Sequence, residues 1–210
     1  MTSTTQARDI SIEDLEDQFD VQVDEHSNFF YEWKKDFAEP TEFEKQRLER
    51  LQQNYQNLAR RKNFSEESVK MVVLSPLLDL AGFYQAPFGL VTEEPVEIIS
   101  EDEDNIVKGK IDVLVVRKKF WVLVIESKQT RFDVVSALPQ AIAYMLDTPD
   151  KLNPVYGLLV NGREFVFLKL SHQPKPIYAR SFALSIERDE ELAQVLSTLK
   201  RLRQDVLANS

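Results

Sequence analysis

Two apolar runs separated by a short basic turn constrain this chain more than any other feature. Residues 111–116 and 121–125 are apolar except for one aspartate, and the four residues between them are Arg117-Lys118-Lys119-Phe120. Short apolar runs that are rich in β-branched residues and flank a polar turn predict two buried strands of a β-hairpin rather than a helix. We therefore expect the rest of the chain to pack around this hairpin.

Charged residues lie where this hairpin should be buried. Asp112 falls inside the first run, and Glu126 and Lys128 directly follow the second. Because side chains alternate along a strand, Glu126 and Lys128 project from one face. If the turn is centred near Lys119, Asp112 pairs with Glu126, since both positions are equally far from 119. Burying such charges is costly unless they pair with each other or bind a metal.

A divalent cation would explain these charges. Two carboxylates, from Asp112 and Glu126, together with a main-chain carbonyl such as that of Ser127 and several waters, suit Mg²⁺ or Mn²⁺. Lys128 would then point at an attacking water or a phosphate. The chain has no cysteine and only two histidines, His26 and His172, so oxygen ligands are the ones that remain.

Two predicted helices flank this hairpin in the sequence. Ser65 is the expected N-cap of a helix over residues 66–81, with Glu66 on its apolar stripe and Pro76 as a kink. A second helix is expected over residues 133–145, where Gln140 and Tyr144 share one face because they are four residues apart. Acidic residues in a first helical turn are common, since they favour the helix dipole, so Glu66 alone does not indicate a site.

The combination of these elements resembles a known family of enzymes. Asp112 followed by Glu126-Ser127-Lys128 on a hairpin resembles the PD-(D/E)XK nuclease superfamily, with Ile111 at the position of the proline in the family name. The Gln140 and Tyr144 pair resembles the signature of its recB-like and type I restriction branch. The resemblance covers residues 64–170. Within it, four short segments resemble the N-terminal nuclease domain of type I restriction enzyme motor subunits: residues 65–70, 76–78, 82–83 and 109–112.

The resemblance implies a fold and a set of site residues. The fold would be an α/β restriction-endonuclease-like αβββαβ core, with a mixed central sheet flanked by helices, an N-terminal helical extension and a long C-terminal helix. Glu66, or Glu67 in its place, would join the metal site. The implied catalytic residues are Asp112, Glu126, Lys128, Gln140 and Tyr144. The implied metal ligands are Glu66, Asp112, Glu126 and Ser127.

The resemblance also implies an activity and partners. We expect an Mg²⁺-dependent or Mn²⁺-dependent endonuclease of restriction-modification type that hydrolyses phosphodiester bonds of DNA, with a partner subunit or a second copy as possible associates. A motor subunit also carries a helicase, but none of the five glycines belongs to a Gly-x-x-x-x-Gly-Lys-Ser/Thr loop, so ATP use is not implied.

Three regions are expected along the chain. Residues 1–28 are polar and acidic with little periodicity, which predicts a disordered segment. Residues 29–63 form a helical extension, in which Thr41 and Glu44 make a capping box before an apolar stripe. That stripe comprises Phe43, Leu48, Leu51, Tyr55 and Leu58. Residues 64–210 form the nuclease-like domain.

The C-terminal third of this domain has two clear patterns. Residues 154–160 and 163–170 flank Asn161-Gly162, a pair that fits the positive φ angles of a type I′ hairpin turn. Residues 187–207 predict a long amphipathic helix with leucines at seven-residue spacing. Such a helix either packs on the core or forms a dimer seam, and we expect core packing.

Charge argues against strong DNA binding, whereas the absence of membrane signals favours a cytoplasmic protein. Affinity for DNA comes largely from basic side chains that contact phosphates. The net charge of this chain is -9, which opposes such binding. The acidic residues crowd into residues 13–25 and 93–104, which leaves basic clusters elsewhere. These clusters are Arg60-Arg61-Lys62, Lys108 with Lys110, and Arg117-Lys118-Lys119. No signal peptide and no apolar run long enough to span a bilayer is expected.

Two other functions fit the same sequence. One is a nuclease-like scaffold that binds nucleic acid or a partner protein without cutting, which the acidic charge favours. The other is a structural α/β interaction protein in which Glu126 and Lys128 pair with each other at a sheet end. This last reading leaves Asp112 within the strand unexplained.

Overall fold

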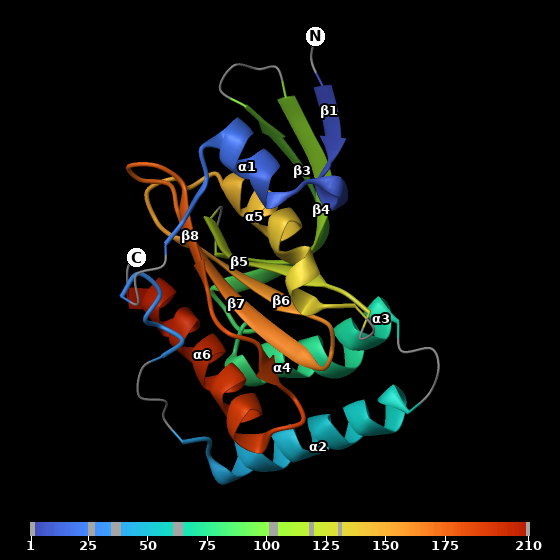
Figure 1. Cartoon of the computed structure of the whole chain (residues 1–210). Coiled ribbons are helices and arrows are strands. Elements are labelled where there is room, and N and C mark those ends of the chain that lie inside the picture. The colour runs from blue at the N-terminus through green and yellow to red at the C-terminus, as the bar shows by residue number, and fades with distance from the viewer. Residues whose placement is uncertain are drawn as a thin grey trace.

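A mixed β-sheet covered by helices on both faces organises the protein (Figure 1). The computed structural model describes residues 3–24, 28–34, 39–60, 65–100, 105–117, 120–129 and 132–208. The mixed central sheet, the flanking helices and the long C-terminal helix were all predicted from the sequence, and the structure confirms them.

The strands of the described residues form one sheet. They are β1 (Ser3–Gln6), β2 (Gln22–Val23), β3 (Phe88–Ile99), β4 (Asn105–Arg117), β5 (Phe120–Ser127), β6 (Val155–Val160), β7 (Glu164–Ser171), β8 (Ile177–Arg180) and β9 (Leu184–Ser185). Their order is β1-β4-β5-β6-β7-β8-β2, with β3 on β4 and β9 on β7. The pairs β1–β4, β5–β6 and β2–β8 are parallel, and the others are antiparallel.

Strand β4 is long enough for two strands to share one of its edges. Strand β3 runs along one edge of β4, from Ile106 to Arg117. On the opposite edge β1 pairs with the start of β4, at residues 105–108, and β5 pairs with its end, at residues 113–117. Among the described strands, none pairs with residues 109–112 on that edge. This break in the sheet lies directly beside Asp112.

The register between β4 and β5 supports the predicted pairing of Asp112 with Glu126. Arg117 lies opposite Phe120, so the turn is centred slightly before Lys119, the centre that we predicted. An irregularity between Val115 and Val116 then shifts the register, and Val113 lies opposite Ile125. Continued by one residue, this register sets Asp112 across from Glu126. A bulge therefore compensates for the displaced turn.

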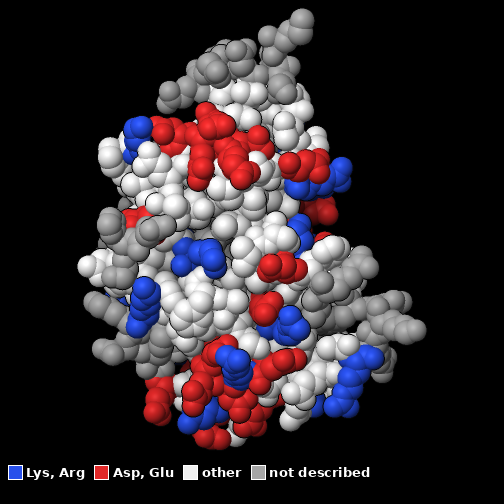
Figure 2. Space-filling view, in the orientation of Figure 1, with Lys and Arg blue, Asp and Glu red and all other residues white. Residues whose placement is uncertain are grey.

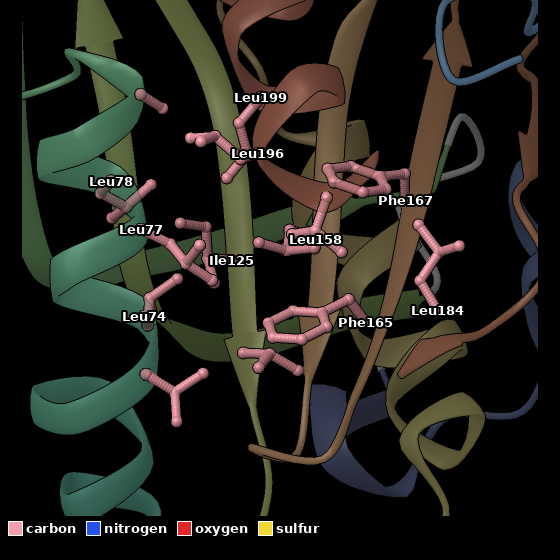
Figure 3. Packing of buried hydrophobic residues seen from close by; sticks show 14 of the residues in the cluster. Leu74, Leu77, Leu78, Ile125, Leu158, Phe165, Phe167, Leu184, Leu196 and Leu199 are labelled. Atoms are coloured by element: carbon pink, nitrogen blue, oxygen red, sulfur yellow. The ribbon is translucent and has the colours of Figure 1, made fainter. Parts of the chain in front are cut away.

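The larger core lies between the sheet and four helical segments, which are α2 (Glu42–Ala59), α3 (Glu66–Val69), α4 (Ser75–Ala81) and α6 (Asp189–Ala208). Figure 3 shows leucines of α4 and α6 interleaved with sheet residues such as Leu158 and Phe167. The leucines Leu192, Leu196 and Leu199 of α6 are fully buried within this single chain. The seven-residue spacing therefore reflects core packing, as predicted, rather than a dimer seam.

Helix α2 has the predicted cap but a narrower buried stripe. The Thr41 hydroxyl accepts from the Glu44 amide at 3.3 Å, and the Glu44 carboxylate accepts from the Thr41 amide at 2.8 Å. Leu48, Leu51 and Tyr55 are buried as expected. Phe43 does not belong to this buried stripe, since it is 60% exposed. The neighbouring Glu44 faces the core side, where its carboxylate accepts a hydrogen bond from Lys200 of α6.

The predicted helix over residues 66–81 contains a π-turn. Helix α3 begins after the predicted cap, where the Ser65 hydroxyl accepts from the Ser68 amide at 3.3 Å. A π-helical segment, η2 (Lys70–Leu74), separates α3 from α4, and the Ser75 amide donates to the Lys70 carbonyl. Pro76 stands in the first turn of α4, where its missing N–H costs little. A π-turn therefore interrupts the α-helical hydrogen bonding directly before Pro76, the residue at which a kink was predicted.

The opposite face of the sheet carries α5 (Leu138–Leu146), α1 (Ile12–Phe19) and a short 3₁₀ turn, η1 (Ala7–Asp9). Here the structure differs from the predicted disorder of residues 1–28, because regular elements form within residues 3–24, the part of this segment that is described up to the gap at 25–27. Strand β1 pairs with β4, a capping box of Ser11 and Asp14 starts α1, and Leu15 is fully buried. Ala7, Ile10 and Val21 of this polar segment are also buried, although their spacing follows no single period, whereas Val23 is 50% exposed.

A buried ion pair fixes residues 28–34 against the sheet. Glu32 is 3% exposed, and its Oε1 accepts from Lys169 Nζ at 2.6 Å and from the Tyr156 hydroxyl at 3.1 Å. Lys169 also donates to the Phe29 carbonyl at 2.9 Å. Burial, followed by the charge and the hydrogen bond of Glu32, raises the pKa of Tyr156 and keeps its hydroxyl protonated.

The hairpin of β6 and β7 is present, but its turn is not of type I′. Gly162 has a φ of 85°, whereas Asn161 is not among the residues with positive φ. A type I′ turn needs positive φ at both central positions. The Asn161 side chain instead accepts from the amides of Arg163 and Glu164, at 3.0 and 2.7 Å. This side-chain turn replaces the backbone geometry that the Asn-Gly pair predicted.

Candidate active site

Asp112 lies at the break in the sheet and both of its oxygens have partners. Its Oδ1 is 2.7 Å from Lys70 Nζ, and its Oδ2 accepts from the Ser127 amide at 2.8 Å. The side chains of Lys70 and Asp112 are 24% and 20% exposed. Because the Ser127 amide donates to Asp112, the carboxylate joins β4 to the end of β5.

Glu126 is the most deeply buried carboxylate of the cluster. It is 3% exposed, and its Oε1 accepts from Lys128 Nζ at 2.8 Å. Among the described residues, its Oε2 is buried and has no hydrogen-bond partner. Burial and the nearby charge of Asp112 raise the pKa of Glu126 to about 7, although Lys128 acts in the opposite direction.

Lys128, Gln140 and Tyr144 form a chain of hydrogen bonds from β5 to α5 and back to β4. Lys128 Nζ donates to Gln140 Oε1 at 3.0 Å, and Gln140 Nε2 donates to the Tyr144 hydroxyl oxygen at 2.8 Å. That oxygen also accepts from the Lys110 amide at 3.2 Å. The amide lies in the part of β4 that no described strand covers on this edge, so the tyrosine supplies the missing acceptor.

Helix α5 carries Gln140 and Tyr144, although it starts later than predicted. Residues 133–145 were expected to be one helix, but residues 134–137 form a 3₁₀ turn, η3 (Val134–Ala137), and α5 begins at Leu138. Asp133 caps η3 by accepting from the Val135 amide at 2.9 Å. Pro139 stands in the first turn of α5, which is the part of a helix that tolerates proline.

Gly109 belongs to the site and was missed in the sequence. A Cβ at this position would lie 2.6 Å from Tyr144 Cε1, 2.7 Å from its hydroxyl oxygen and 2.8 Å from the Ala7 Cβ. Any side chain there would push Tyr144 away from β4. A glycine inside a strand often marks such a close approach, so the signal was present.

Lys70 was also missed. It stands one helical turn after Glu66 and hence shares its face. Burial alone would lower the pKa of Lys70, but the hydrogen bond and charge of Asp112, with smaller effects of Glu67 and Glu66, raise it. Lys70 is therefore a second cation of the cluster, besides Lys128.

Glu66 lies close enough to influence the cluster electrostatically, since its charge also contributes to the raised pKa of Glu126. Within the described ranges, no three acidic, histidine or cysteine side chains are grouped as metal ligands, so Glu66 does not complete a set with Asp112 and Glu126. Metal ligation by Glu66, or by Glu67, stays a prediction. The same holds for the main-chain carbonyl of Ser127.

The residues present suit Mg²⁺ or Mn²⁺ in donor type. Both ions prefer oxygen ligands, and Mg²⁺ is commonly held by one or two carboxylates with several waters. Glu126 Oε2 is a buried carboxylate oxygen without a partner in the described part of the chain, and a buried charge of this kind is costly. Asp112 and Glu126 would hold such a cation, and its positive charge would offset this cost.

Basic side chains near the site are largely paired. Lys108 Nζ lies 2.9 Å from Glu97 Oε2, and Lys110 Nζ lies 3.2 Å from Glu93 Oε2. The predicted basic clusters at residues 61–62 and 118–119 fall outside the described residues. Figure 2 shows acidic side chains gathered over α1 and again toward α2 and the adjoining part of α6. This face of the molecule offers no broad basic surface among its described residues.

Comparison with known proteins leaves the family open. The sequence matches no protein-family model and no curated protein. The described helices include none with the length and apolar character needed to cross a membrane. Function must therefore be inferred from the geometry of the site.

Proposed function

We propose that this protein is a metal-dependent nuclease of the PD-(D/E)XK type that hydrolyses phosphodiester bonds of DNA. The observation that carries the proposal is the convergence of five side chains from β4, α5, and β5 with the residue that follows it, namely Asp112, Glu126, Lys128, Gln140 and Tyr144. The order of elements supports it, because a helical segment, β3, the β4–β5 hairpin, α5 and β6 follow one another as in an αβββαβ core.

Each residue has a role in the proposed reaction. Asp112 and Glu126 would hold Mg²⁺ or Mn²⁺, and the bound ion would polarise the scissile phosphate and lower the pKa of a water. Lys128 would orient the attacking water or offset charge that develops on the phosphate. Glu126 and Gln140 each accept from the Lys128 ammonium group and so fix its position. Tyr144 holds Gln140 and is itself held by the Lys110 amide.

A partner would complete the proposed function. The net charge of -9 opposes association with DNA. The lysines on β4 that lie closest to Asp112 in sequence are paired with glutamates of β3. We propose that a partner subunit or a second copy contributes part of the basic surface, as in a restriction-modification assembly.

A nuclease-like scaffold without catalytic activity is the second candidate. It is favoured by one observation: lysines already neutralise both carboxylates, through the Lys70–Asp112 and Lys128–Glu126 pairs. A scaffold of this kind would bind nucleic acid or a partner protein and would have no need for a metal. Binding of Mn²⁺ therefore separates the two candidates.

The test is digestion of plasmid DNA, linear DNA and RNA with Mg²⁺ or Mn²⁺. We expect DNA cleavage by the wild type, and a loss of about 10²-fold or more in Lys128→Ala and Asp112→Ala, because an electrostatic contribution of one well-placed group is of that size. Lys200→Ala is the matched control, since Lys200 pairs with Glu44 on α2, away from the site.

Circular dichroism of each variant would show that the fold is retained. Cleavage by Lys128→Ala at the wild-type rate would contradict the proposed mechanism. If the protein binds DNA but neither binds a metal nor cuts any substrate, it is instead the non-catalytic, nuclease-like scaffold.

A further inference from the structure

Lys70 holds the carboxylate that a metal would need. Of the two partners of Asp112, the Ser127 amide belongs to the end of β5 and is fixed by the sheet. Lys70 is the movable partner, because its side chain is long and 24% exposed. Its ammonium group lies 2.7 Å from Asp112 Oδ1, at the side of the cluster where Asp112 meets the helical segment.

We propose that Lys70 is an internal counter-cation: it neutralises Asp112 in the metal-free protein and must leave this carboxylate before a divalent cation can bind. This inference rests on the proposed function and concerns the regulation of the same site. Both oxygens of Asp112 already accept a hydrogen bond, and Lys70 is the positively charged one of their two partners. The ammonium group of Lys70 and a metal ion held by Asp112 would also repel each other in this partly buried site.

The structure provides a second place for the released ammonium group. Glu66 and Glu67 lie four and three residues before Lys70, a spacing at which side chains on a helix meet. Both carboxylates already act on Lys70 electrostatically. Lys70 therefore has two alternative sets of partners, Asp112 on the sheet or the glutamates on its own helical turn.

The helical geometry of the backbone changes at Lys70. Its amide donates to the carbonyls of both Glu66 and Glu67, and its carbonyl accepts from the Ser75 amide across the π-turn. Single π-turns inside helices are frequent at functional sites. The π-turn begins at Lys70, so the change in helical geometry coincides with the residue that contacts Asp112.

A purely structural role for Lys70 makes a different prediction. If the ion pair with Asp112 only joined the helix to the sheet, removing Lys70 would lower stability and would not improve metal binding. If Lys70 competes with the metal, removing it should expose Asp112 and strengthen metal binding.

Titration calorimetry of the full chain with Mn²⁺ tests this without any measurement of activity. We expect Lys70→Met to bind Mn²⁺ about tenfold more tightly than the wild type, which is within the usual range for coupling between two binding events. Lys108→Met is the control for loss of one positive charge, since Lys108 lies on the same strand as Asp112 but pairs with Glu97 of β3. Its affinity for Mn²⁺ should equal that of the wild type.

The outcomes separate this inference from the proposed function. Unchanged or weaker Mn²⁺ binding in Lys70→Met, with binding lost in Asp112→Ala, would overturn the role of Lys70 and leave the metal site in place. No Mn²⁺ binding in any variant would overturn both. If Lys70→Met does not fold, Lys70→Gln retains a hydrogen-bond donor without the charge, and the same comparison applies to it.

Discussion

The missing side chain of Gly109 allows Tyr144 to approach β4 closely. The tyrosine hydroxyl accepts from the Lys110 amide at 3.2 Å and from Gln140 at 2.8 Å, so it connects the strand to the helix that positions Lys128. Burial raises the pKa of Tyr144, against the effect of its bond to Gln140, and the phenol stays protonated at neutral pH. One glycine thus controls the position of a hydrogen-bonded chain of three side chains.

We expect Gly109→Ala to destabilise the protein by about 1–3 kcal/mol, the usual cost of forcing extra volume into a packed site. Its Cβ would come within 2.6 Å of the Tyr144 ring. Metal-dependent cleavage should fall as well, because Tyr144 would shift and release Gln140. Chemical denaturation measures the first effect. Gly89→Ala is the control, since its Cβ would meet the nearest atom at an ordinary 3.5 Å.

At the scale of elements, the N-terminal segment shows how far tertiary contacts can override composition. Residues 1–28 are too polar to predict an ordered structure by themselves. Strand β1 nevertheless extends the sheet beside β4, and α1 packs its buried Leu15 in the same core as α5. Within residues 3–24, order arises because β4 offers an edge on which β1 can pair, which no local pattern reveals.

Leu15→Ala and Phe43→Ala test this assignment together. Leu15 is fully buried and Phe43 is 60% exposed, although the sequence placed the first in a disordered region and the second in an apolar stripe. We expect Leu15→Ala to lower the free energy of unfolding by about 2–5 kcal/mol, as buried leucines do, and Phe43→Ala to change it by less than about 0.5 kcal/mol. Equal effects in urea denaturation would contradict the structure.

For the molecule as a whole, one buried carboxylate couples stability to pH. Glu126 is buried near the end of β5, and burial raises its pKa from 4.5 to about 7. The folded state therefore binds a proton on Glu126 in a pH range where the unfolded state has released it. This stabilisation is complete below about pH 4.5 and is lost as pH rises through about 7.

We expect the melting temperature of the metal-free wild type to fall between pH 5 and pH 8 relative to that of Glu126→Gln, by several degrees in a protein of this size. Glu126→Gln carries no titrating group at this position, so other ionisations cancel in the comparison. One of these is His172, whose pKa burial and Lys151 lower to about 4. Differential scanning calorimetry measures the difference. Parallel curves for the two proteins would show that Glu126 does not titrate in this range.

Local sequence patterns predicted much of the fold and most of the candidate site. The hairpin, the one-face spacing of Glu126 and Lys128, the Gln140 and Tyr144 pair and the capping of α2 all follow from neighbours within a few residues. Alternation along a strand and the helical repeat are properties of the backbone, and hence they can be read from sequence. The mixed sheet flanked by helices was implied by the resemblance to the PD-(D/E)XK superfamily.

Contacts between distant residues decided the rest. Lys70 meets Asp112 across 42 residues of sequence, and the Tyr144 hydroxyl meets the Lys110 amide across 34. The bulge that aligns Asp112 with Glu126 and the sheet edge that orders the N-terminal strand depend equally on tertiary packing. The sequence alone determined which side chains each element presents. Only the tertiary structure decided which of them meet, because that depends on how the sheet divides at residues 109–112 and on what packs over the gap.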